Sequence, residues 1–152
     1  MAIRIRGCVG VPKRIEDTLN LLRLKTRFSC NIFPETASIK GMLEKAKDFI
    51  TYGEIDRETL TLLLKKRLRM KGKGNKKVSE EELKKITGFS TFEEFSDALI
   101  SGKIKLKDFD IFQPYFRLRP PSHGLKSVKE HWPKGDLGYR GKEINELLKR
   151  MV

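Results

Sequence analysis

The chain has 152 residues, 38% of them hydrophobic and 35% charged, and its 33 lysines and arginines against 20 acidic residues give a formal net charge of +13. This length suits one domain with a real core, and the charge imbalance indicates a polyanionic partner because self-repulsion destabilises the compact monomer. A membrane partner is not expected, because no apolar run approaches ~18 residues and no Lys-rich amphipathic helix is present.

The N-terminal third alternates between strand and helix patterns. Residues 3–6 alternate apolar and basic side chains, which predicts a strand with one face on a core and the other presenting arginines. Pro12 opens a helix with an apolar stripe, and residues 28–32 predict a second strand. Thr36 caps a second helix, and residues 49–52 predict a third strand. This β-α-β-α-β order favours an α+β or α/β layer with both helices on one face of a small sheet.

The middle of the chain is predicted to be helical, with a basic loop inserted. Asp56 is a candidate cap for one helix, and capping boxes at Ser79 and Thr91 predict the starts of two more. Residues 65–77 contain eight basic residues, no acidic residue and no apolar periodicity in their centre. We therefore expect a flexible basic loop there.

The last third begins with another alternation of apolar residues and arginines, which predicts a strand over residues 115–119 that returns to the sheet. A loop of glycines and basic residues follows, and an apolar stripe predicts a final helix over residues 142–151. We expect a single domain, 1–152, with a core at 1–55, a helical insertion at 56–110, and the returning strand, basic loop and C-terminal helix at 111–152.

Nothing in the sequence indicates catalysis. We find no Gly-rich phosphate loop and no His-x-Glu or Glu-x-x-His pair, so we expect no enzyme, cofactor or small-molecule substrate. The two cysteines, Cys8 and Cys30, are expected to be free buried thiols in a cytosolic protein, because no secretory signal is present. A zinc site formed by these cysteines with His123 and His131 matches no known spacing and is not predicted.

The basic side chains fall into three blocks, whereas the acidic residues concentrate in residues 80–97. This pattern predicts one cationic side that lies on RNA and one acidic side that faces outward or toward another basic protein. Arginine suits bidentate phosphate contacts, and lysines of a flexible loop add affinity without geometry. The expected RNA-binding residues are Arg4, Arg6, Lys13, Arg14, Arg23, Lys25, Arg27, Lys40, Lys71, Lys73, Lys76, Lys77, Arg117, Arg119, His123, Lys126, Lys129, Arg140 and Lys142.

Several of these side chains have an alternative interpretation. Arg4 and Arg6 can form a charged strand edge that deters aggregation. His123 can bind a phosphate or a 2′-hydroxyl, or be a surface histidine without a role. Trp132 and Tyr139 can either stack on splayed bases or pack against the body of the domain.

Two sets of residues resemble a known family. In the core they are Ile5-Arg6-Gly7, residues 18–24 and the basic-Gly-Met signature Lys40-Gly41-Met42. Toward the C-terminus they are Phe116-Arg117-Leu118-Arg119-Pro120-Pro121, Gly138-Tyr139-Arg140 and residues 144–151. Over nearly its whole length the chain resembles the archaeal form of large-subunit ribosomal protein thirty, the family of eukaryotic large-subunit ribosomal protein seven.

The resemblance implies a core related to the ferredoxin-like fold and a structural role on large-subunit ribosomal RNA, near the 5S RNA and beside other ribosomal proteins, without catalysis or cofactor. The family usually has an arginine soon after the proline pair, where this chain has Ser122-His123-Gly124. Eukaryotic members carry a long basic N-terminal extension, and its absence favours the archaeal type. Two other hypotheses stay open: a ribosome-assembly factor on the same fold and, from charge alone, a nonspecific DNA-binding protein.

Overall fold

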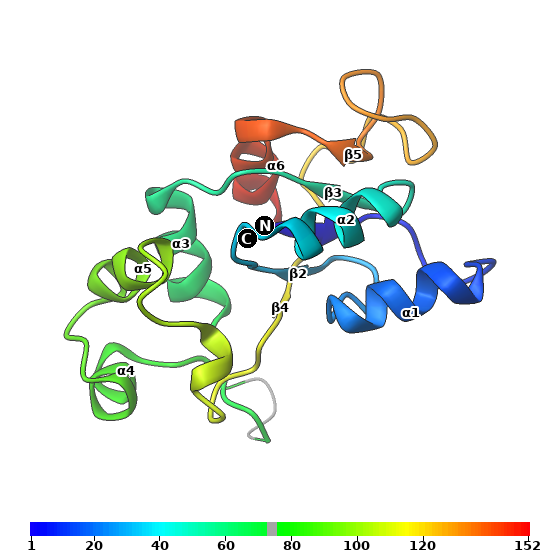
Figure 1. Ribbon diagram of the computed structural model, residues 1–152. Helices are drawn as coiled ribbons and strands as arrows, with labels where there is room; N and C mark the ends of the chain where they lie inside the picture. The colour runs from blue at the N-terminus through cyan, green and yellow to red at the C-terminus, as the bar shows by residue number, and fades with distance from the viewer. Residues whose placement is uncertain (73–75) are drawn as a thin grey trace.

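A computed structural model describes residues 1–72 and 76–152. Its centre is a sheet in the order β4-β2-β1-β3-β5 (Figure 1). The strands are short: β1 is Ala2–Arg4, β2 Ser29–Asn31, β3 Ile50–Tyr52, β4 Phe116–Arg117 and β5 Gly138–Tyr139. Neighbouring strands are antiparallel except β3 and β5, which run parallel.

Both faces of the sheet are covered. Ala2 and Ile50 pack in one hydrophobic cluster with residues of α1 (Lys13–Leu21) and α2 (Ala37–Lys45). Ile3 and Cys30 pack on the other face, in a cluster that includes α3 (Arg57–Arg67) and α6 (Ile144–Met151). The alternation of side chains along each strand divides the two clusters. The α+β fold, with both core helices on one face, is therefore confirmed.

The insertion between β3 and β4 contains α3, α4 (Glu80–Thr87), α5 (Phe92–Ile100) and a 3-10 turn at Leu106–Asp108. Ser79 forms the predicted capping box with Glu82, and Gly88 ends α4 in the left-handed conformation that glycine favours, with φ 80°. Thr91 accepts a hydrogen bond from Glu94 N, but the Glu94 carboxylate accepts from Ser90 N instead of completing the box. Local caps thus fix where these helices begin.

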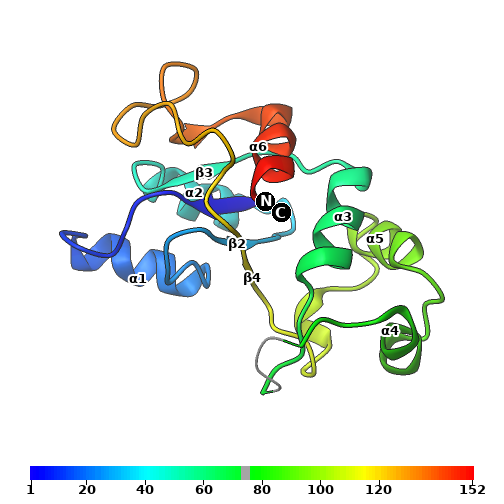
Figure 2. The same cartoon turned by 180° about the vertical axis from the view of Figure 1, so that it is seen from behind.

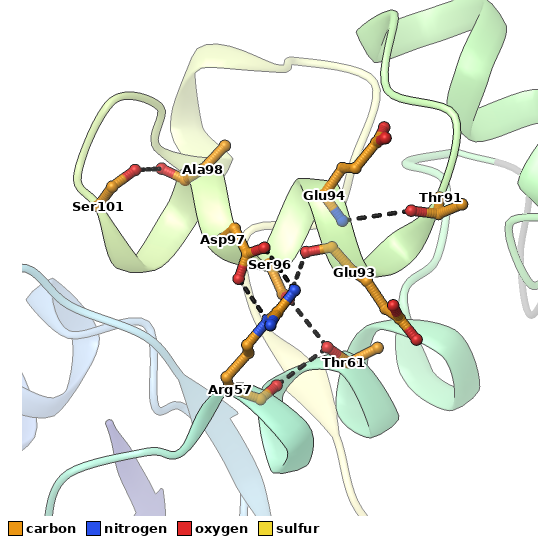
Figure 3. A network of polar contacts seen from close by, with 9 residues as sticks. All are labelled: Arg57, Thr61, Thr91, Glu93, Glu94, Ser96, Asp97, Ala98 and Ser101. Carbon is orange, nitrogen blue, oxygen red and sulfur yellow. Dashed lines mark hydrogen bonds and ion pairs between the residues drawn. The ribbon is translucent and has the colours of Figure 1, made fainter.

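Polar contacts join α3 to α5 (Figure 3). The Arg57 guanidinium meets both carboxylate oxygens of Asp97, at 2.5 and 2.6 Å. The hydroxyl groups of Thr61 and Ser96 lie 2.9 Å apart, and each lies within hydrogen-bonding distance of a main-chain carbonyl of its own helix. Because each hydroxyl has one hydrogen, one of the two donates to the other and the second donates to its carbonyl. Because α3 also packs in the core cluster of α6, these contacts connect the insertion to the sheet.

Three local predictions were wrong. Residues 65–67 belong to α3, and residues 68–72 and 76–77 carry the bridges Arg69↔Lys77 and Met70↔Phe112, so most of the expected basic loop is ordered. Its expected flexible centre at 73–75 lies outside the described residues. The expected loop before the last helix contains the strand β5, which pairs with β3. Cys8 is free as predicted but exposed, whereas Cys30 is buried.

Candidate nucleic-acid interface

The chain enters or leaves all five strands at one end of the sheet, because β1 and β4 end where β2, β3 and β5 begin. Main-chain hydrogen bonds Phe28 N→Arg4 O (2.8 Å) and Leu118 N→Phe28 O (3.0 Å) join the segments there. We call residues 5–14, 23–28 and 118–131 the basic end. Figures 1 and 2 both show α1 and the loops before β5 at one end of the molecule and α4 and α5 at the other.

The basic end brings together cations of the first and third sequence blocks. Arg6 lies over the Phe49 ring at 4.8 Å, and Arg27 lies over the Phe28 ring at 4.7 Å while donating to Ile5 O. These contacts with the aromatic rings orient the two guanidinium groups. Among the described residues, the following exposed cations of this end form no ion pair: Arg6, Lys13, Arg14, Arg23, Lys25, Arg27, Arg119, Lys126 and Lys129.

Arg4 has a different role from the one expected. Its side chain is only 2% exposed, because the strand face expected to present it is covered by α1 and the segment that follows. The guanidinium donates four hydrogen bonds of 2.8–2.9 Å to main-chain carbonyls, those of Arg6, Gly7, Leu24 and Lys25. Arg4 therefore ties together the two loops that carry Arg6 and Lys25, and its side chain is not presented at the surface.

Arg140 is also buried, at 5% exposure, which corrects its expected place among the presented cations. It forms an ion pair with buried Asp136 and lies over the Trp132 ring at 4.6 Å. Asp136 also accepts hydrogen bonds from the main chain at Lys126 (2.5 Å) and Ser127 (3.4 Å). The pair thus fixes the course of the loop that presents Lys126.

The two aromatic residues considered for base stacking, Trp132 and Tyr139, have different surroundings. Trp132 is half-buried and packs against Arg140, whereas Tyr139 is 56% exposed and its hydroxyl donates to Glu54 Oε1 at 2.7 Å. The structure therefore packs Trp132 against the domain and leaves one side of Tyr139 in solvent.

Other expected contacts lie away from the basic end. Lys40, at the start of α2, pairs with Glu35 at 2.7 Å, and Lys142 lies in the 3-10 turn that precedes α6. Both segments belong to the opposite end of the sheet, where β2 and β5 finish. They do not join the cluster of unpaired cations.

The lysines of the second block lie within the insertion, between α3 and α4. Lys71, Lys76 and Lys77 are exposed, and Lys76 pairs with Glu82 at 2.6 Å. Lys73 lies outside the described residues. This block therefore does not share the end of the sheet that gathers the other two.

Of two further expected residues, Arg117 borders the basic end and His123 lies within it. Arg117 is exposed on the edge strand β4, where its Nη2 donates to the Tyr115 hydroxyl at 3.5 Å. His123 is exposed in a turn closed by Gly124 N→Pro121 O (3.0 Å), and its φ of 64° lies in the left-handed region. Both side chains are accessible to a partner.

The sequence analysis did not select Arg67, which the structure places close to Arg119. Its Nη2 donates to Val152 O at 3.4 Å, and burial together with the charges of Arg119 and Arg69 lowers its pKa. Like charges brought together in this way favour a bound anion. The sequence offers one signal for a role of Arg67, its Arg-x-Arg spacing with Arg69. Both residues belong to residues 65–77, which we had interpreted as a flexible loop.

The described residues contain no group of three or more His, Cys, Asp or Glu placed to hold a metal ion. Burial raises the pKa of the Cys30 thiol to about 12, which keeps it protonated and unreactive at neutral pH. In the same part of the chain, every helix is too short or too polar to cross a lipid bilayer.

The chain is similar to known proteins over its whole length. The family model described as "Ribosomal protein L30p/L7e" matches residues 2–50, which form β1 to the start of β3. A relative named "Large ribosomal subunit protein uL30", from Archaeoglobus fulgidus, is 49% identical over 149 residues, covering 98% of this chain and 97% of the relative. Proteins of the same name from Nanoarchaeum equitans (51% over 152 residues; 98% and 96% covered) and Thermoplasma volcanium (46% over 151; 99% and 90%) are also similar.

The α+β core, which contains the match to the family model over residues 2–50, makes the chain similar to the L30p/L7e class of ribosomal proteins. The sequence identity to the three relatives extends over nearly the full length of the chain and shows the family. The chain belongs to the uL30 family of the large ribosomal subunit, as its motifs predicted. This is a family of ribosomal structural proteins and not of enzymes, and its location is the ribosome in the cytoplasm.

Proposed function

We propose that this chain is a structural constituent of the large subunit that binds ribosomal RNA directly through its basic end. One observation carries the proposal: strand pairing brings cations more than 90 residues apart in the sequence, such as Lys25 and Arg119, to one end of the sheet without acidic partners. A cluster of unpaired cations on a folded scaffold binds phosphates with release of counterions.

The scaffold sets the geometry of these contacts in advance. Arg4 fixes the loops after β1 and α1, and the pair of Asp136 and Arg140 fixes the loop before β5. Guanidinium groups held in this way make bidentate phosphate contacts, and the lysines add charge. The family resemblance also implies a position close to the 5S RNA, which we include in the proposal.

Salt-dependent binding to large-subunit ribosomal RNA tests the proposal. The triple substitution Lys13→Gln, Lys25→Gln and Lys129→Gln removes three exposed charges at the basic end. The matched control is Lys84→Gln, Lys85→Gln and Lys103→Gln, which removes three exposed charges from the insertion. Because each lost phosphate contact lowers the slope of log K against log salt by about 0.7–0.9, we expect the first triple variant to lose about two units of slope. The control should lose less than one.

An equal loss of salt slope in both triple variants would refute a directed interface, because binding would then depend only on the net charge of the chain. Equal affinity of the wild-type chain for duplex DNA would instead favour nonspecific binding, because base and shape contacts then add nothing. Sedimentation separates the constituent from an assembly factor. A constituent is present at one copy per mature large subunit after a high-salt wash, whereas an assembly factor is found only on precursor particles.

A further inference from the structure

A cleft of about 460 Å³ lies between the loop before β5 and the helix α6. Lys126, Trp132 and Asp136 line it from the loop, Arg140 lines it from the position after β5, and Glu143, Glu146 and Leu147 line it from the helix side. Its volume is within the range of roughly 300–1,000 Å³ that holds small ligands. A main-chain hydrogen bond, Ser122 N→Arg150 O at 3.1 Å, joins the loop to α6 and holds these two walls of the cleft together.

The floor of the cleft is built from buried groups. Leu147 is 1% exposed, and Arg140 is 5% exposed with its Nε hydrogen unpartnered by any described residue. The ring centre of Trp132 lies 4.6 Å from the Arg140 guanidinium carbon and 4.8 Å from the Lys126 ammonium. Because Lys126 is exposed and Arg140 is buried, only the lysine can move away from the indole without disturbing the core.

The rim carries charges of both signs. Glu143 and Glu146 are three residues apart, so they lie on the same side of the helix start. Both carboxylates are exposed and, among the described residues, neither makes an ion pair or a hydrogen bond through its side chain. Arg150 and Lys149 follow on the same helix and also line the cleft. Unpaired carboxylates beside cations suit a ligand with hydrogen-bond donors at one end and an anion at the other.

We propose that this cleft holds one nucleotide of ribosomal RNA, splayed out of its strand, with guanine as the preferred base. The base takes the place of Lys126 over the indole ring, as splayed bases do on aromatic side chains. Its N1–H and exocyclic amino group donate to the carboxylates of Glu143 and Glu146. The phosphate binds Arg150 and the displaced Lys126.

Uracil lacks an exocyclic amino group and is disfavoured at the two carboxylates. A good bidentate contact to a base discriminates by about tenfold or more. This inference rests on the proposed RNA-binding function, but the cleft has a readout of its own. Trp132 is the single tryptophan of the chain, so its fluorescence reports the cleft alone.

The first measurement titrates the full chain with GMP and with UMP and follows the quenching of Trp132 fluorescence. We expect GMP to bind about tenfold more tightly than UMP. The double substitution Glu143→Gln and Glu146→Gln should reduce this preference to about twofold or less, because each amide keeps only one acceptor oxygen and loses the negative charge that strengthens hydrogen bonds from guanine. The control Glu81→Gln, an exposed glutamate of α4, should keep the preference. Equal binding of GMP and UMP, or a preference that survives the double substitution, would overturn the proposal.

The second measurement separates an RNA nucleotide from a free one. When refolded large-subunit ribosomal RNA saturates the chain, we expect Trp132 to be quenched already and GMP to cause no further change. Undiminished GMP binding to the RNA-bound chain would assign the cleft to a free nucleotide and overturn its assignment to RNA. Failure of the wild-type chain to bind the RNA at all would refute the proposed function, whereas RNA binding without a GMP preference would refute the cleft alone.

Discussion

Replacement of Arg4 and of Arg6 by methionine tests whether two arginines that the sequence pattern assigns to one strand have opposite roles. The alternation places both on the same face, but Arg4 ends β1 and is 2% exposed, whereas Arg6 lies in the loop that follows and is exposed. We expect Arg4→Met to lower the free energy of unfolding strongly, and Arg6→Met to affect RNA binding instead.

The hydrogen bonds of Arg4 set the magnitude. Of its four main-chain acceptors, the Leu24 carbonyl is bonded in a buried position and the others are partly reached by water. A stranded buried acceptor costs about 1–3 kcal/mol, and the partly buried ones cost less. The net loss is about 2–4 kcal/mol, which for a chain of this length corresponds to a fall in Tm of roughly 5–15 °C. Arg6→Met loses a cation–π contact worth about 0.5–1 kcal/mol, or less than about 4 °C.

Thermal unfolding followed by circular dichroism measures the two Tm values, and filter binding to ribosomal RNA measures the affinities. The Arg6 variant should lose about one unit of the salt slope, in keeping with one lost phosphate contact. The reasoning fails if Arg4→Met unfolds within about 2 °C of the wild-type chain while its RNA affinity falls. That result would make Arg4 a presented contact, as its sequence pattern alone suggests.

The remaining predictions concern the edge strand, the thiols and a close approach of main chains. Arg117→Ala combined with Arg119→Ala should weaken RNA binding and leave Tm nearly unchanged, since both side chains are exposed; a large drop in Tm would make them structural. A thiol reagent at pH 8 should modify Cys8 at once and Cys30 only on unfolding, because burial raises the pKa of Cys30 to about 12 and leaves very little thiolate. Two thiols that react equally fast would contradict the buried position. Gly53→Ala should destabilise the fold by more than about 2 kcal/mol in chemical denaturation, because its Cβ would lie 2.1 Å from a main-chain oxygen; an unchanged midpoint would refute this packing.

Elements with local signals could be predicted from the sequence. Ser79 and Thr36 carry their own hydrogen-bond partners within three residues, so their helix starts follow from short patterns. The apolar stripe of α6 likewise depends only on its own residues. The order of the core elements was therefore predicted correctly.

Features that depend on distant segments could not be predicted. The strand β5 has two residues and no alternation, and it exists because Gly138 lies beside Thr51, 87 residues earlier. The burial of Arg4 depends on carbonyls about 20 residues along the chain. Charge alone does not distinguish a cation that organises a loop from one that the loop presents.

A map of the intact large subunit containing this chain tests the central claim most directly. We predict ribosomal RNA phosphates within hydrogen-bonding distance of the exposed cations of the basic end, among them Arg27 and Arg119, with α4 and α5 turned away from that RNA surface. A map in which α4 and α5 lie on the RNA and the basic end faces solvent would contradict the account.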